Sequence, residues 1–115
     1  MNKDIDMVRG DTLSFAIKVT GLGQDFTTAF FSCKKFENDT EYVFQKSLSD
    51  GITKDSSGTT EDGKSYAIYK IRVSPADTAN IDAGNYYYDL QVGVNTDIFT
   101  PLRGYLNVEM DVTLS

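Results

Sequence analysis

The residues that decide the fold class are Tyr86-Tyr87-Tyr88-Asp89-Leu90-Gln91-Val92-Gly93-Val94, where an apolar or aromatic side chain occupies every second position. Successive side chains of a strand point to opposite faces, so this period predicts a long strand with one face in a core. Residues 13–20, 66–73 and 106–113 alternate in the same way. These four stretches predict a protein built from half-buried β-strands.

The remaining chain supplies shorter strands and the turns between them. Further extended segments are expected at residues 4–8, 27–36, 42–48 and 98–102. Asp50-Gly51 is typical of a hairpin turn. Residues 54–64 contain no apolar side chain and predict a solvated loop or hairpin tip. The strands around Ile5 and Val108, first and last in the chain, are expected at the edges of the sandwich.

One helical start is visible, at Ser74-Pro75-Ala76-Asp77. Ser74 suits the N-cap, proline suits the first helical position, and the acid complements the exposed amides. Ile81-Asp82-Ala83-Gly84 ends the turn. With seven or eight strands and one short helical turn in a single domain over residues 1–115, the sequence predicts an all-β fold, an antiparallel β-sandwich.

The segment Asp82-Ala83-Gly84-Asn85-Tyr86-Tyr87-Tyr88 resembles the start of strand F in immunoglobulin-like domains, which has the pattern Asp-x-Gly-x-Tyr-x-Cys. Tyr88 stands where the cysteine would be, as suits a sandwich without a disulfide. The resemblance implies that the sandwich is immunoglobulin-like, with a tyrosine corner formed by Tyr86, Asp82 and Gly84 in which the Tyr86 hydroxyl donates to nearby backbone. A loop followed by an aromatic strand is the plainer alternative, but the helical turn just upstream favours the corner.

Composition excludes several function classes. The 115 residues carry a formal charge of −6, with no His and one Cys. Without His, the chain lacks the commonest general base and the usual zinc ligand sets, so neither an enzyme, a metal site nor a cofactor is expected. The acidic balance without a basic cluster argues against nucleic acid. No apolar run approaches the ~20 residues of a membrane span.

Five motifs in a fixed order resemble a family of small bacteriophage proteins. They are Arg9-Gly10-Asp11-Thr12, Gln45-Lys46-Ser47, Ser74-Pro75-Ala76-Asp77-Thr78, Ala83-Gly84-Asn85-Tyr86-Tyr87-Tyr88-Asp89-Leu90-Gln91 and Gly104-Tyr105-Leu106-Asn107-Val108-Glu109-Met110-Asp111-Val112-Thr113. Together they look like the N-terminal domain of phage baseplate upper proteins and related head or tail accessory proteins. The resemblance covers nearly the whole chain.

This resemblance implies a virion structural role on the tail, the baseplate or the capsid. The protein would be made in the host cytoplasm and located in the virion. Its partners would be other virion proteins or further copies of itself. Baseplate proteins of this type continue into a C-terminal part that carries receptor-binding trimers, whereas this sequence ends at Ser115. Its place in the particle is left open.

The candidate interface consists of Ile5 and Met7 on the first strand, an expected edge that a partner strand could join, and of the outward-facing Tyr66, Ile68 and Tyr87. Exposed aromatic and aliphatic groups on a sheet face are typical of interfaces. The alternative function is a carbohydrate- or host-surface-binding module that uses exposed tyrosines and the Asp55–Lys64 loop.

Two further motifs have simpler explanations. Arg9-Gly10-Asp11 matches the integrin tripeptide but is better explained as a turn between strands. The oxygen-rich residues 55–61 lack the ligand spacing of a calcium loop, so a solvated tip is favoured.

Overall fold

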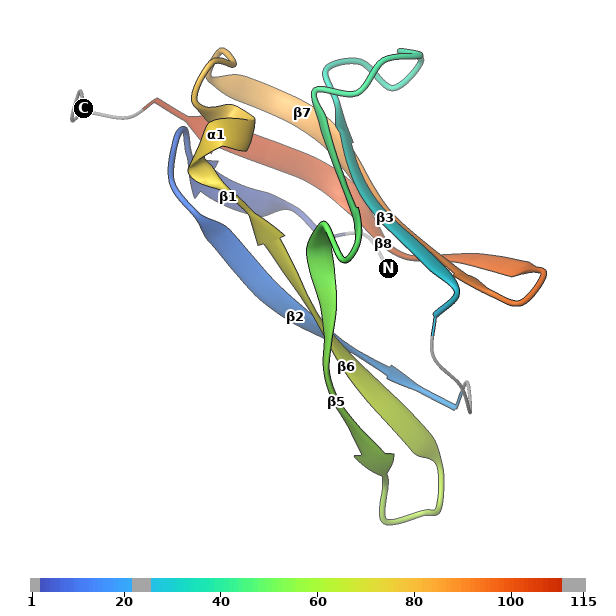
Figure 1. The fold of residues 1–115 in the computed structure, drawn as a ribbon. Coiled ribbons are helices and arrows are strands. Elements are labelled where there is room, and N and C mark those ends of the chain that lie inside the picture. Colours follow the sequence, from blue (N-terminus) through green and yellow to red (C-terminus); the bar gives the residue numbers. More distant parts are fainter. Residues whose placement is uncertain (1–2, 22–25, 111–115) are drawn as a thin grey trace.

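The computed structural model describes residues 3–21 and 26–110, which form eight strands and one short helix (Figure 1). The strands are β1 (Ile5–Val8), β2 (Leu13–Thr20), β3 (Thr28–Lys34), β4 (Phe44–Leu48), β5 (Gly51–Thr59), β6 (Ser65–Val73), β7 (Gly84–Val94) and β8 (Asp97–Glu109). The helix α1 (Pro75–Thr78) lies between β6 and β7. The predicted all-β class, strand count and single helical turn are confirmed.

The strands form one continuous sheet in the order β1-β8-β7-β3-β4-β5-β6-β2. This sheet folds over on itself, so that the β1-β8-β7-β3-β4 part faces the β5-β6-β2 part across the core and the whole is nearly barrel-shaped (Figure 1). The layered packing agrees with the expected sandwich. The pairing is mixed, however, because β1 runs parallel to β8 and β4 runs parallel to β5.

Two expectations about connections are therefore wrong. Asp50-Gly51 does not join a hairpin: Ser49 and Gly51 have φ angles of 66° and 97°, and they direct the chain from one layer into the other. The last strand, β8, is internal because it lies between β7 and β1, and the two edges are β1 and β2.

The core is formed by the apolar side chains at every second position of the strands, as the alternating sequence pattern predicts. In β7 and β3 these side chains include the fully buried Leu90 and Phe31. The Phe15 ring of β2 meets the Phe31 ring of β3 edge-on at a centroid distance of 5.5 Å, which links the two layers. The Tyr69 ring of β6 stacks on Phe26 at 4.2 Å. Such aromatic contacts add to the burial of apolar area that holds the layers together.

Two strands are longer than the sequence indicated. β5 continues to Thr59, so most of the predicted 54–64 loop is an exposed strand paired with β6. β8 is one strand from Asp97 to Glu109, not two. Its register shifts between Leu90 and Val92 of β7, opposite Pro101, which has no N–H to donate to the ladder. The predicted strand end at residues 111–113 lies outside the described residues.

Helix α1 is fastened to the sheet by its cap and by an ion pair. The Ser74 N–H and hydroxyl both donate to Asp77 Oδ2 at 2.8 Å. Lys46 Nζ of β4 lies 2.7 Å from the same carboxylate oxygen. Among the described residues no helix has the length and apolar character to cross a membrane.

The Arg9-Gly10-Asp11 segment is a turn that packs against this helix. The Asp11 N–H donates to the Val8 carbonyl at 3.1 Å, and Gly10 takes a φ of 81°. The Gly10 N–H donates to the buried Thr78 hydroxyl at 2.9 Å, and Arg9 donates to the Ile81 carbonyl at 3.2 Å. The tripeptide therefore has a structural explanation.

Candidate functional site

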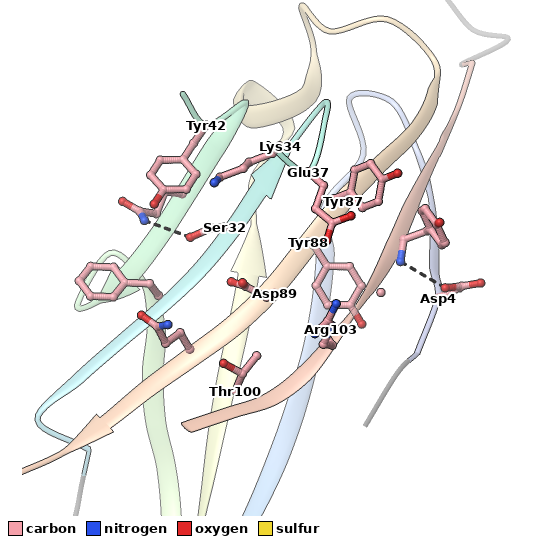
Figure 2. A pocket seen from close by; sticks show the side chains of 15 residues that line it. Asp4, Ser32, Lys34, Glu37, Tyr42, Tyr87, Tyr88, Asp89, Thr100 and Arg103 are labelled. Atoms are coloured by element: carbon pink, nitrogen blue, oxygen red, sulfur yellow. Dashed lines mark hydrogen bonds between the residues drawn. The ribbon is translucent and has the colours of Figure 1, made fainter. Parts of the chain in front are cut away.

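An open groove of about 1040 Å³ lies on the outer face of the layer that contains β4, β3, β7 and β8 (Figure 2). Its walls and floor are mostly the side chains that alternate with the buried rows, because strand geometry sends every second side chain outward. A middle part lined by polar groups is flanked by aromatic rings, and one end is closed by the segment leading into β1.

The middle of the groove is a row of polar side chains across four neighbouring strands. Gln45 Nε2 of β4 donates to the Ser32 hydroxyl of β3 at 3.0 Å. Ser32 lies opposite Asp89 of β7, and Asp89 lies opposite Arg103 of β8. In the described structure, neither the Asp89 nor the Arg103 side chain forms a hydrogen bond or an ion pair. Both charged groups are therefore available to a bound molecule.

Aromatic rings border this polar row. The Tyr87 and Tyr105 rings of β7 and β8 pack at a centroid distance of 5.1 Å, and Tyr105 remains 45% exposed. Hydrogen bonding with Tyr105 raises the pKa of Tyr87. On the other side, Lys34 Nζ lies 5.3 Å from the Tyr42 ring centroid. Phe30 is the remaining exposed ring in the lining.

The segment around β1 closes one end of the groove. The buried Tyr88 hydroxyl donates to the Lys3 carbonyl, and burial, assisted by the Asp4 charge, raises the pKa of Tyr88 to about 12. Asp4 accepts from the Tyr105 N–H at 3.2 Å, and Asp6 accepts from Asn107 Nδ2 at 2.8 Å. These carboxylates thus join β1 to β8.

The three residues predicted to form a tyrosine corner meet at the start of β7. The Tyr86 ring is buried, and its hydroxyl donates to the Asp82 carbonyl at 2.6 Å. Burial raises the pKa of Tyr86, and the Asp82 charge adds to the effect. Gly84 takes a φ of 151° between them. This contact anchors the start of the strand that carries Tyr87 and Asp89.

The predicted interface residues do not form one surface. Met7 is buried in the core and Ile5 packs against it. Both side chains point inward, since they alternate with the outward Asp6. They contribute to the fold rather than to an exposed patch.

Tyr66 and Ile68 lie on the outer face of the opposite layer from Tyr87 and are half-buried. Lys18 Nζ lies 4.6 Å from the Tyr66 ring centroid. The Tyr66 ring also covers Gly58, where a Cβ would lie 2.7 Å from the tyrosine hydroxyl oxygen. Only Tyr87 of the predicted set lines the groove.

Sequence reasoning considered Tyr105 as part of an aromatic carbohydrate platform, but it missed the other groove residues, above all Asp89, Arg103 and Phe30. The alternating pattern of the strands does indicate that each of these side chains faces outward. Their meeting depends on β3, β7 and β8 being neighbours, which no local pattern specifies.

The described residues bring together no group of three or more His, Cys, Asp or Glu side chains that could hold a metal ion. Asp55, from the oxygen-rich segment, pairs with Lys70 of β6 at 3.3 Å. The thiol of Cys33 is buried in the core, and burial raises its pKa to about 12. At neutral pH this thiol is protonated and unreactive.

No family model matches this chain, and no curated protein is similar enough to count as a relative. Function is therefore argued from the motifs and from the geometry of the groove.

Proposed function

We propose that this chain is a non-enzymatic structural protein of a bacteriophage particle. It docks as a small β-sandwich on other proteins of the tail or baseplate, or of the capsid, in an accessory or decoration role. The order of the five motifs supports the viral assignment. The groove supports docking, because it is the surface where exposed aromatic rings and unpaired charged groups occur together.

The groove has the composition of a protein interface. Tyrosine, phenylalanine and arginine are enriched at interfaces, and tyrosine and arginine often carry most of the binding energy. Here Tyr105, Phe30 and Arg103 project from paired strands, so the backbone that carries them is fixed before a partner arrives. Binding therefore orders side chains but not the backbone, which limits its entropic cost.

A structural role also fits the chemistry of the side chains. The sequence contains no His, and Cys33 is buried with a raised pKa. The hydroxyls of the buried Tyr86 and Tyr88 donate to backbone carbonyls. These observations support docking over catalysis.

Reconstitution tests this proposal. Particles that lack the chain are incubated with purified protein, and the bound fraction is measured by co-sedimentation. Arg103→Glu reverses a charge in the groove and should weaken binding by at least about tenfold. Arg72→Glu makes the same change on β6 in the opposite layer and serves as the matched control. Thermal unfolding should show both variants folded, and equal binding of both would contradict docking through the groove.

Carbohydrate binding is the second candidate. The groove places the Tyr87–Tyr105 ring pair beside Asp89, Gln91 and Arg103, and ligand sites combine such apolar surfaces with a few placed polar groups. This geometry favours the groove over the 55–64 segment as the sugar site. A glycan array with wild type and Tyr105→Ala tests it: a glycan retained only by wild type supports this candidate, and no retained glycan removes it.

A further inference from the structure

Strand β2 has a long open edge in the described structure. It pairs only with β6, over all 8 of its residues and without a register shift (Figure 1). It contains no proline, and Lys18 is its one charged residue. The Lys18 Nζ lies 4.6 Å from the centroid of the Tyr66 ring of β6. The ammonium group is therefore turned toward β6 and does not cover the open side of β2.

The other edges of the sheet carry features that hinder pairing. β1 has 4 residues, and Asp6 is one of them. Beyond Ile52, β5 has no strand on its outer side among the described residues, but its register shifts between Lys54 and Ser56, where Asp55 is inserted. Short strands, bulges and charges are the usual means by which sheet edges avoid pairing with other chains. By contrast β2 is long and regular, and its one charge is turned away.

The pairing with β6 shows which backbone groups of β2 reach the open side. The Gly21 N–H donates to the Ser65 carbonyl at 2.7 Å, in a register that continues the β2–β6 ladder. Hydrogen-bonded and non-hydrogen-bonded pairs alternate along an antiparallel ladder, so the odd-numbered residues of β2 bond to β6. The even-numbered residues direct their N–H and carbonyl groups to the open side; they are Ser14, Ala16, Lys18 and Thr20.

The core-facing side of β2 is also incompletely covered. Its inward side chains are all half-buried; they are Leu13, Phe15, Ile17 and Val19. On the neighbouring strand β6, Ile71 and Val73 are fully buried. A strand added at the open edge of β2 would cover the apolar row and pair the exposed backbone groups at the same time.

We propose that β2 pairs with the β2 strand of a second copy, in antiparallel orientation, about a twofold axis at Ala16. Residues 13–19 of the two copies pair in this register. The even-numbered residues form the hydrogen-bonded pairs, which uses the groups that point to the open side. The same surface serves in both copies, so the assembly closes at the dimer. None of the groove residues lies on β2, so this interface is separate from the proposed docking surface.

The side chains of β2 fit a second β2 strand in this register. Apolar residues meet on the core-facing side and small or uncharged residues meet Ala16 and Lys18 on the outward side; the pairs are Leu13–Val19, Phe15–Ile17, Ser14–Lys18 and Ala16–Ala16. An axis at Lys18 would bring two ammonium groups together, which is unfavourable. An axis at Ile17 would leave Leu13 opposite Gly21. The axis at Ala16 avoids both, so a second copy is the occupant that the sequence of β2 favours.

Analytical ultracentrifugation over a range of concentrations tests the proposal. The wild-type chain should show a monomer–dimer equilibrium. Ala16→Asp and Ala16→Lys each place like charges opposite each other at the axis, and each should weaken dimerisation by about fivefold or more. An equimolar mixture of these two variants brings opposite charges together and should restore the dimer.

Ser57→Asp adds the same charge to the exposed outer part of β5 and is the matched control, which should dimerise as wild type. Thermal unfolding should show all variants folded, because Ala16 and Ser57 are both exposed. Three results would each overturn the proposal: a wild type that stays monomeric, an Ala16→Asp chain that dimerises like Ser57→Asp, or a mixture that stays dissociated.

Disulfide trapping tests the register independently. Ala16→Cys places one thiol of each copy at the axis, where a hydrogen-bonded pair holds the two Cα atoms about 5.5 Å apart, within reach of a disulfide. Mild oxidation should therefore link the copies, while the native Cys33 is buried and protonated. Thr20→Cys, exposed on the same strand, is the control, because its two thiols lie roughly 27 Å apart in this register at about 3.4 Å per residue. Equal yields from the two variants would contradict the axis at Ala16.

Discussion

Three consecutive tyrosines of β7 perform three different tasks. Tyr86 buries its ring and donates to the Asp82 carbonyl, Tyr88 fastens the segment before β1 through the Lys3 carbonyl, and Tyr87 faces the groove. Because successive side chains of a strand point to opposite faces, Tyr86 and Tyr88 lie on one face and Tyr87 on the other. Three identical residues in a row thus occupy three different environments.

Tyr86→Phe should lower the free energy of unfolding by roughly 0.5–1.5 kcal/mol, because it removes one partly buried hydrogen bond and leaves the Asp82 carbonyl unpaired. Tyr87→Phe is the matched control, since it removes a hydroxyl from the exposed face and should change stability little. Urea denaturation of both variants measures the difference. Equal midpoints and slopes for Tyr86→Phe and wild type would show that the bond contributes nothing.

Asp77 should make stability depend on pH. Burial acts to raise the pKa of Asp77, but hydrogen bonds from Lys46 and Ser74 outweigh burial and hold it below its usual value. The pKa of Asp77 is thus lower in the folded state than in the unfolded state, where it is about 3.9. The ionised carboxylate therefore contributes its whole stabilising free energy above about pH 3.9, and this contribution is lost as the pH falls through the folded-state pKa.

Asp77→Asn should therefore lower the free energy of unfolding by ~1–3 kcal/mol at pH 7. The difference in this free energy between the variant and wild type should become smaller as the pH falls below about 4. Denaturant midpoints at several pH values measure the gap. Asp62→Asn, in the exposed β5–β6 turn, is the control and should have little effect at either pH. A gap that stays constant into acid would contradict the assigned role of the carboxylate.

At the scale of elements, β1 is an edge strand that belongs to the core. It buries Met7, pairs in parallel with β8 and accepts a hydrogen bond from Asn107 at Asp6. The two residues before it, Lys3 and Asp4, accept from Tyr88 and from the Tyr105 N–H. Gly104 lets it approach, because a Cβ at that position would overlap the Lys3 carbonyl oxygen. Deleting β1 would thus disturb both the fold and the end wall of the groove.

Met7→Ala should lower the free energy of unfolding by about 2–5 kcal/mol, the usual cost of truncating a large buried side chain. Ile5→Ala, at a half-buried position of the same strand, should cost less. Chemical denaturation ranks the two variants. The reverse order would show that β1 does not contribute to the core through Met7.

The elements that the sequence predicted well are those with one buried face. The inward-facing side chains of β3, β6 and β7 could be predicted, because a strand with one buried face carries an apolar residue at every second position. β5 was missed beyond Thr53 because its exposed residues are polar and are held by backbone pairing with β6. The groove escaped prediction because strand neighbours are a long-range property, as the parallel β1–β8 and β4–β5 pairs also illustrate.

At the scale of the whole molecule, the two outer faces have different surfaces. The β3-β7-β8 face carries the groove with its unpaired Asp89 and Arg103. On the β6 face, Tyr66 is engaged by Lys18 and covers Gly58. Under the proposed docking role, a partner would therefore bind the face that carries the groove.

Quantitative mass spectrometry of purified particles tests the central proposal most directly. The proposal requires that a phage or prophage encodes this chain. Phage particles from the source strain are purified by density gradient, and the peptides of this chain are measured relative to the major capsid and tail proteins. We expect the chain at a fixed copy number in every preparation. Its absence from purified particles, with abundant protein left in the lysate, would contradict a virion structural role.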